Sequence, residues 1–168
     1  MMRILIAGVG NVLRADDGFG VQVARRLEHH TFPEGVRVIE TGIGGIALVQ
    51  ELQEGWDALV VVDTVDLDRP PGHVVLIDPD VVDVHTLSWA DRHDLLADMH
   101  LTTPDRALML AKALGVLPAR VLEVGCIPED PHAVGETLSG PVLAAVDVAV
   151  AEILRHVNEL LAGEVPAA

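Results

Sequence analysis

The sequence predicts a single α/β domain with three α/β/α layers, doubly wound around a mostly parallel five-stranded sheet. Short apolar runs alternate with amphipathic segments along the chain, which is the pattern of strands joined by helices. One of those runs contains no polar residue, as in strands that are covered on both faces. Hydrophobic residues make up 50% of the 168 residues, enough for one sizeable core. We place the domain at residues 1–162 and a frayed tail at residues 163–168.

The chain opens with a predicted strand and a predicted helix. Residues 3–7 form a short apolar run that stops at Gly8. Beyond it, Phe19, Val23 and Leu27 recur every four residues with charged residues between them. This spacing is typical of an amphipathic helix.

A second strand and helix lead to the clearest strand of the chain. Residues 36–40 are predicted as a strand and residues 46–52 as a helix, joined by a glycine-rich turn at residues 41–45. Residues 58–62 are an uninterrupted apolar run closed by Asp63, as expected of a central parallel strand.

The second half of the chain continues the alternation. It adds two strands and two helices, at residues 74–77, 106–114, 121–126 and 142–161. Ser139 is the expected N-cap of the last helix, and Pro141 fits in its first turn. The irregular stretch at residues 78–99 is expected to combine a loop with a helix.

Composition excludes several classes of function. The 11 Lys and Arg residues against 26 Asp and Glu give a net charge of −15, which would repel a nucleic-acid backbone. Cys126 is the only cysteine, so neither an intramolecular disulfide nor a thiolate metal cage can form. The first apolar run is far shorter than a signal peptide or a membrane span. We therefore expect a cytoplasmic protein without a membrane partner.

Acidic residues follow two of the predicted strands. In open parallel sheets, ligands bind beyond the carboxyl ends of the strands, where the strand order reverses. Asp16 and Asp17 follow the first strand and Asp63 ends the third, so a 2-1-3 order would bring them to one crevice. Carboxylates crowded there need a cation, a proton or a basic partner. As alternatives, the first two could cap the next helix, and Asp63 could bond to a neighbouring loop.

A third ligand would have to be one of the eight histidines. His85, His93 and His100 occur before a later helix, and periodicity does not choose among them. Each is also compatible with a structural role. Two carboxylates and one imidazole would suit a borderline divalent metal such as nickel, zinc or cobalt.

Two competing motifs are poorly supported. The Gly8 and Gly10 pair begins like a dinucleotide fingerprint, but Leu13 stands at the third glycine position and acidic residues follow. A serine hydrolase would need a Gly-x-Ser-x-Gly elbow, which this sequence lacks. Cys126 ends a buried-type strand, where a packed small side chain is favoured over a nucleophile.

The loop after the first strand carries a long, specific motif. Residues 8–21 read Gly-Val-Gly-Asn-Val-Leu-Arg-Ala-Asp-Asp-Gly-Phe-Gly-Val and resemble the opening motif of the hydrogenase maturation endopeptidases. The resemblance continues at residues 61–65, 70–72 and 124–129, so it covers nearly the whole chain. The glycine-rich residues 41–45 also resemble a family loop implicated in substrate contact, although a flexible turn explains them equally well.

The resemblance implies an endopeptidase that removes the C-terminal extension from the nickel-loaded precursor of a nickel-iron hydrogenase large subunit. Nickel would arrive with the precursor as a recognition mark, so no tightly bound cofactor is expected in the free enzyme. The family's metal-contacting residues carry over to Asp17, Asp63 and His100. His100 is matched by its distance from residues 124–129, although Leu101 departs from the family pattern, and His93 is the alternative.

The catalytic groups are left open at this point, with Asp17 and Asp63 as the candidates. Either a metal-polarised carbonyl or a metal-activated water would serve hydrolysis. Two other classes also remain. One is a non-enzymatic nickel-binding chaperone for the precursor, and the other is a zinc hydrolase that acts on small molecules.

Overall fold

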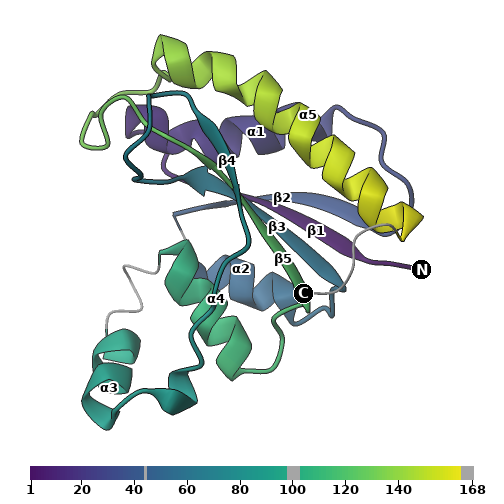
Figure 1. The fold of residues 1–168 in the computed structure, drawn as a ribbon, viewed down its shortest axis with the longest axis vertical. Coiled ribbons are helices and arrows are strands. Elements are labelled where there is room, and N and C mark those ends of the chain that lie inside the picture. The colour runs from purple at the N-terminus through teal and green to yellow at the C-terminus, as the bar shows by residue number, and fades with distance from the viewer. Residues whose placement is uncertain (44, 98–102, 164–168) are drawn as a thin grey trace.

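A computed structural model describes residues 1–43, 45–97 and 103–163, arranged as a sheet between two helical layers (Figure 1). The sheet has five strands in the order β2-β1-β3-β5-β4. Its strands are β1 (Ile4–Val9), β2 (Val36–Gly42), β3 (Ala58–Thr64), β4 (Val74–Ile77) and β5 (Arg120–Cys126). Only the pairing of β4 with β5 is antiparallel among these strands. The doubly wound, mostly parallel fold is confirmed, and the strand order contains the 2-1-3 arrangement that would bring the acidic residues to one crevice.

Helices cover both faces of the sheet. They are α1 (Phe19–Glu28), α2 (Gly45–Leu52), α3 (Trp89–Ala97), α4 (Pro104–Ala113) and α5 (Gly140–Ala162), with short 3₁₀ helices η1 (Ala15–Gly18) and η2 (Val84–Thr86). α1 and α5 lie on one face of the sheet, and α2 and α4 lie on the other (Figure 1). α3 lies apart from both layers, in the stretch where a loop with a helix was predicted (Figure 1).

The two central strands supply side chains to both cores in alternation, because successive strand residues point to opposite faces. Ile4 and Ile6 of β1 pack with the α1 and α5 side, whereas Leu5 and Ala7 pack with the α2 and α4 side. All six residues of β1 are buried. This two-sided burial explains why the central strands are continuous apolar runs in the sequence.

Two glycines let α1 start directly on the sheet. A Cβ atom on Gly8 would lie 2.3 Å from the Gly20 carbonyl oxygen. A Cβ atom on Gly20 would lie 2.1 Å from the Val62 oxygen and 2.2 Å from the Val9 oxygen. The helix therefore approaches β1 and β3 backbone to backbone, and this contact places η1 beside the carboxyl end of β3.

The ends of α5 differ in part from the prediction. Ser139 occupies the N-cap position and Pro141 lies in the first turn, as expected. The Ser139 hydroxyl, however, donates to the Asp16 carboxylate instead of capping the helix. Gly163 closes the helix with a left-handed φ of 75°, which glycine adopts at little cost. The domain boundary at residue 162 stays a prediction, and residues 164–168 lie outside the described residues.

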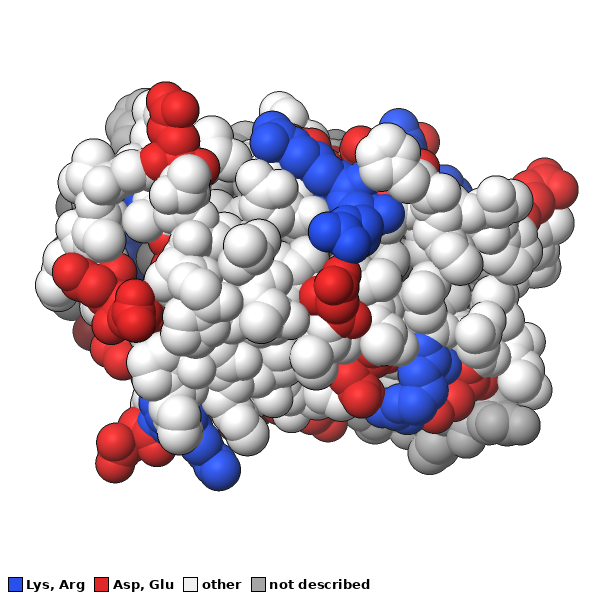
Figure 2. Space-filling model, turned by 90° about the horizontal axis from the view of Figure 1, so that it is seen from above, with Lys and Arg blue, Asp and Glu red and all other residues white. Residues whose placement is uncertain are grey.

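The surface over α1 and α5 carries paired charges. Arg26 of α1 and Asp147 of α5 are 2.7 Å apart, and Arg155 contacts Glu152 at 2.8 Å and also Glu159. On the face seen in Figure 2, basic side chains lie next to acidic ones, with uncharged surface between the groups. None of the described helices is long and apolar enough to cross a membrane.

Candidate functional site

The candidate site lies where β1 and β3 end side by side. Gly8 of β1 pairs with Val62 of β3, so the loop after β1 begins next to Asp63. That loop returns to the sheet as η1, which contains Asp16 and Asp17. The topology thus brings the acidic residues to one edge of the sheet, as the sequence predicted.

The loop after β1 has a constrained backbone. Gly10 has a φ of 138°, and a Cβ atom there would lie 1.9 Å from the carbonyl oxygen of Asp17. Asn11 makes two hydrogen bonds in this loop: its backbone N–H donates to Asp17 Oδ2 at 3.0 Å, and its side-chain Oδ1 accepts from the Leu13 N–H at 2.9 Å. The loop therefore folds back so that Asp17 lies against Gly10 and Asn11.

The two adjacent aspartates have different surroundings. Asp16 is 2% exposed and accepts hydrogen bonds from the N–H groups of Glu129 at 2.8 Å and Ser139 at 2.6 Å and from the Ser139 hydroxyl at 2.9 Å. Asp17 accepts from Asn11 and, at 3.4 Å, from the Thr64 hydroxyl next to Asp63. The helix-capping alternative is wrong for both, because the N-cap of α1 is Gly18 and these carboxylates bond elsewhere.

The negative charge of the Asp63 carboxylate is poorly compensated by its described surroundings. Burial raises its pKa to about 7, the Thr64 N–H opposes the rise through a 2.8 Å hydrogen bond, and the negative charge of Asp17 adds to it. Smaller contributions come from Glu123 and Asp105. Because no positive charge among the described residues offsets these effects, this part of the site would favour a cation or a proton.

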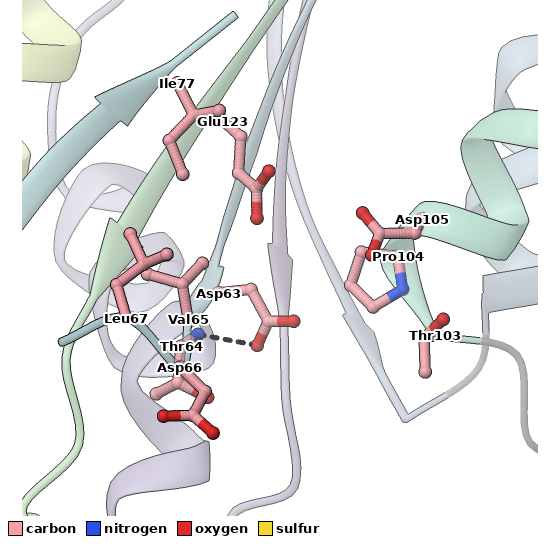
Figure 3. A pocket seen from close by; sticks show the side chains of 10 residues that line it. All are labelled: Asp63, Thr64, Val65, Asp66, Leu67, Ile77, Thr103, Pro104, Asp105 and Glu123. Atoms are coloured by element: carbon pink, nitrogen blue, oxygen red, sulfur yellow. Dashed lines mark hydrogen bonds between the residues drawn. The ribbon is translucent and has the colours of Figure 1, made fainter. Parts of the chain in front are cut away.

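A pocket of about 370 Å³ opens beside Asp63 (Figure 3). Its acidic lining residues are Asp63, Asp66, Asp105 and Glu123, and its apolar ones include Val65, Leu67 and Ile77. In Figure 3, Asp105 at the start of α4 lies across the pocket from Asp63 and Glu123. Burial raises the pKa of Glu123, and the nearby Asp105 adds to this effect.

Sequence reasoning missed the acidic contributions of Asp105 and Glu123. Glu123 was visible as a lone charge inside the apolar run 121–126, which is an unusual place for a carboxylate. Asp105 gave no such signal, because an acidic residue after Pro104 is ordinary in the first turn of a helix.

The structure places two of the three candidate histidines. His85 lies exposed in η2, and His93 lies on α3 with its ring stacked on Trp89 at a centroid distance of 5.4 Å. His100 lies outside the described residues. Among the side chains that the structure describes, no three His, Cys, Asp or Glu residues are placed to hold a metal ion. The three-residue ligand set therefore stays a prediction, with Asp17 and Asp63 as its described members.

Cys126 is buried at the end of β5. Burial raises the pKa of its thiol to about 12, and the negative charge of Asp16 adds to this effect. A cysteine nucleophile needs a thiolate, which such a thiol does not form near neutral pH. The interpretation of Cys126 as a packed small side chain agrees with this environment.

These features define a class of protein: a doubly wound α/β domain with an acidic crevice at the carboxyl edge of its sheet. The model of the hydrogenase maturation protease family HycI matches residues 21–156. The chain belongs to the hydrogenase maturation protease family.

Relatives and solved structures agree with this assignment. The hydrogenase expression/formation protein HoxM of Azotobacter vinelandii is 38% identical over 158 residues, 94% of this chain and 73% of that protein. HupD of Rhodobacter capsulatus is 35% identical over 93% of this chain and 71% of its own length. The hydrogenase maturating endopeptidase HybD of E. coli has a similar structure, with a TM-score of 0.71 and 28% identity over 94% of this chain and 93% of that one. The hydrogenase 2 maturation peptidase from Thaumarchaeota archaeon SCGC_AB-539-E09 has a TM-score of 0.67 and 32% sequence identity, over 93% of this chain and 98% of that one.

Proposed function

We propose that this chain is an endopeptidase that removes the C-terminal extension from the precursor of a nickel-iron hydrogenase large subunit. Membership of the maturation protease family supports peptidase activity, and a solved relative is named a hydrogenase maturating endopeptidase. The location of the site is best supported by the proximity of Asp17 to Asp63 at the carboxyl edge of the sheet, where the charge of Asp17 raises the pKa of Asp63 and the Thr64 hydroxyl contacts Asp17. The pocket beside Asp63 offers room for a segment of the precursor.

In this proposal, nickel belongs to the precursor and serves as the recognition mark. Asp17, Asp63 and His100 complete its coordination, and oxygen and nitrogen ligands of this kind suit a borderline divalent metal. The positive charge would relieve the repulsion between the two carboxylates, whose mutual effect helps to raise the pKa of Asp63. Binding of the loaded precursor is thereby favoured over binding of the empty one.

Bound in this way, the scissile peptide lies next to the metal. Nickel would supply Lewis-acid chemistry there: it would either polarise the scissile carbonyl for attack by water or lower the pKa of a bound water that attacks this carbonyl, and in both cases the peptide C–N bond breaks to give a carboxylate and a free amine. One of the two carboxylates, Asp17 or Asp63, would assist by accepting a proton from the attacking water.

The test is incubation of the purified protein with a nickel-loaded precursor. We expect a shortened large subunit with the wild-type protein, and strongly slowed or no shortening with the variants Asp17→Asn, Asp63→Asn and His100→Ala. A tight complex with an intact precursor would instead support the chaperone function. Stoichiometric zinc in the purified protein, with activity lost on chelation of the enzyme alone, would support a zinc hydrolase. Full cleavage by all three variants would contradict metal recognition by these residues.

Replacement of Cys126 tests the remaining nucleophile. We expect Cys126→Ala to cleave the precursor at close to the wild-type rate, because the thiol is buried and its pKa is about 12. The measurement is the initial rate of cleavage, with thermal unfolding recorded on the same preparation. A folded Cys126→Ala protein that no longer cleaves would assign the nucleophile to this residue.

A further inference from the structure

The two aspartates of η1, Asp16 and Asp17, have different roles. We propose that Asp16 is a positioning residue, which holds Asp17 toward Asp63 by joining the loop after β1 to the segment that follows β5. The inference rests on the proposed function of the Asp17 and Asp63 site. It assigns to Asp16 no contact with nickel or with the precursor.

Asp16 connects parts of the chain that are far apart in sequence. Its hydrogen-bond donors Glu129 and Ser139 lie 113 and 123 residues away, near the two ends of the loop between β5 and α5. Burial of a carboxylate is costly unless such donors compensate it, and hydrogen bonds to a charged acceptor are the strong ones. Asp16 therefore fixes η1 against this loop.

A second set of contacts joins the same two segments. The Ala15 N–H donates to the Gly135 oxygen at 2.7 Å, the Gly135 N–H donates to the Leu13 oxygen at 3.1 Å, and Arg14 forms a β-bridge with Gly135. Ala15 has a φ of 45°, the only positive φ of a non-glycine residue among those described. Such a conformation costs on the order of 1 kcal/mol and persists only where its surroundings enforce it. The bridge and the Asp16 carboxylate together enforce it.

Asp17 depends on this anchoring because its own contacts are few. Its side chain receives one good hydrogen bond, from Asn11 within the same loop, and one long contact of 3.4 Å from Thr64. A contact of that length is too weak to hold the loop against the sheet. The direction of the Asp17 carboxylate is therefore set by the backbone of η1, which Asp16 holds in place.

Asp16 does not fit the alternative role of a metal ligand. It is 2% exposed, and both of its carboxyl oxygens already accept hydrogen bonds from the loop that precedes α5. A metal bound there would have to displace these donors. Asp17 instead lies close enough to Asp63 for its charge to raise the pKa of that residue.

A double-mutant cycle distinguishes an effect of Asp16 that acts through Asp17 from an independent effect of Asp16 on cleavage. We expect Asp16→Asn and Asp17→Asn each to lower kcat/KM for the nickel-loaded precursor by about tenfold or more. If Asp16 acts through Asp17, the double variant should be no worse than Asp17→Asn alone. Multiplied losses in the double variant would overturn the proposal. Where cleavage by Asp17→Asn is too slow to measure, the same four proteins are compared by their Kd for the loaded precursor.

A second readout needs no activity. The backbone N–H of Asn11 donates to the Asp17 carboxylate, so the hydrogen exchange of this backbone amide reports whether Asp17 keeps its position. We expect this amide to exchange about tenfold faster or more in Asp16→Asn than in the wild type. Unchanged protection would overturn the positioning role. If Asp16→Asn shows faster exchange but the wild-type protein neither cleaves nor binds the precursor, the positioning role of Asp16 is kept and the proposed function is rejected.

The matched control is Val157→Ala. Val157 is buried on α5, about 27 Å along the helix from Ser139 at 1.5 Å per residue, so this variant weakens the core away from the site. We expect its folded form to keep wild-type kcat/KM and a protected Asn11 amide. A loss of both in Val157→Ala would mean that general destabilisation, and not Asp16, explains the result.

Discussion

Asp63→Asn is expected to abolish cleavage of the nickel-loaded precursor and, near pH 8, to make the free protein more stable than the wild type. Asparagine has nearly the same shape as aspartate but carries no charge, so it removes both the proposed metal ligand and a poorly compensated anion. Burial and the neighbouring carboxylates Asp17, Glu123 and Asp105 all disfavour that anion. If this site binds a cation as proposed, the free protein is less stable than the protein with the cation bound.

The effect on stability has a definite pH dependence. The folded-state pKa of Asp63 is about 7, above the unfolded value of about 3.9, so the folded protein binds this proton more tightly. The resulting contribution to stability is fully present below about pH 4 and is lost as the pH rises through 7. Each unit of pKa difference corresponds to about 1.4 kcal/mol. The wild type therefore loses a few kcal/mol of its free energy of unfolding over this pH range, and Asp63→Asn does not.

Urea unfolding of both proteins between pH 5 and 8 measures this difference. The comparison is needed because the net charge of −15 also destabilises the wild type as the pH rises. Asp66→Asn is the matched control, since Asp66 lines the same pocket but is exposed. We expect the control to follow the wild-type pH dependence. An Asp63→Asn protein that is less stable than the wild type at pH 8 would contradict the assigned environment of this carboxylate.

The elements of the fold were predictable because each has a local signal. β1 and β3 are continuous apolar runs since both of their faces are covered, and α1 shows its buried face at a spacing of four residues. The direction of β4 had no such signal. β4 is a four-residue strand that pairs only with β5, and its sequence pattern is the same whether it runs parallel or antiparallel to that strand.

The candidate site was predictable only where topology alone decides. A 2-1-3 order was enough to bring Asp17 and Asp63 together. It was not enough to separate Asp16 from Asp17, because the partners of Asp16 lie more than a hundred residues away. Long-range hydrogen bonds of this kind leave no periodic trace in the sequence. His100 was assigned by resemblance and remains a prediction.

Gly20→Ala is expected to destabilise the fold strongly. The added Cβ atom would lie 2.1 Å from the Val62 oxygen and 2.2 Å from the Val9 oxygen. Both oxygens belong to the backbone of central strands, which cannot turn aside as a flexible side chain would. α1 must therefore move away from the sheet, and we expect a loss of about 3 kcal/mol or more in the free energy of unfolding.

The matched control is Gly140→Ala, at the start of α5. A Cβ atom there would have no described neighbour within 4 Å outside the adjacent residues, so the substitution should change stability by no more than about 1 kcal/mol, including the restriction that Pro141 places on the residue before it. Urea unfolding gives both values at one pH and temperature. The movement of α1 in Gly20→Ala would also displace η1, so its folded fraction should cleave more slowly than Gly140→Ala. Wild-type stability of Gly20→Ala would show that α1 does not approach β1 and β3 backbone to backbone.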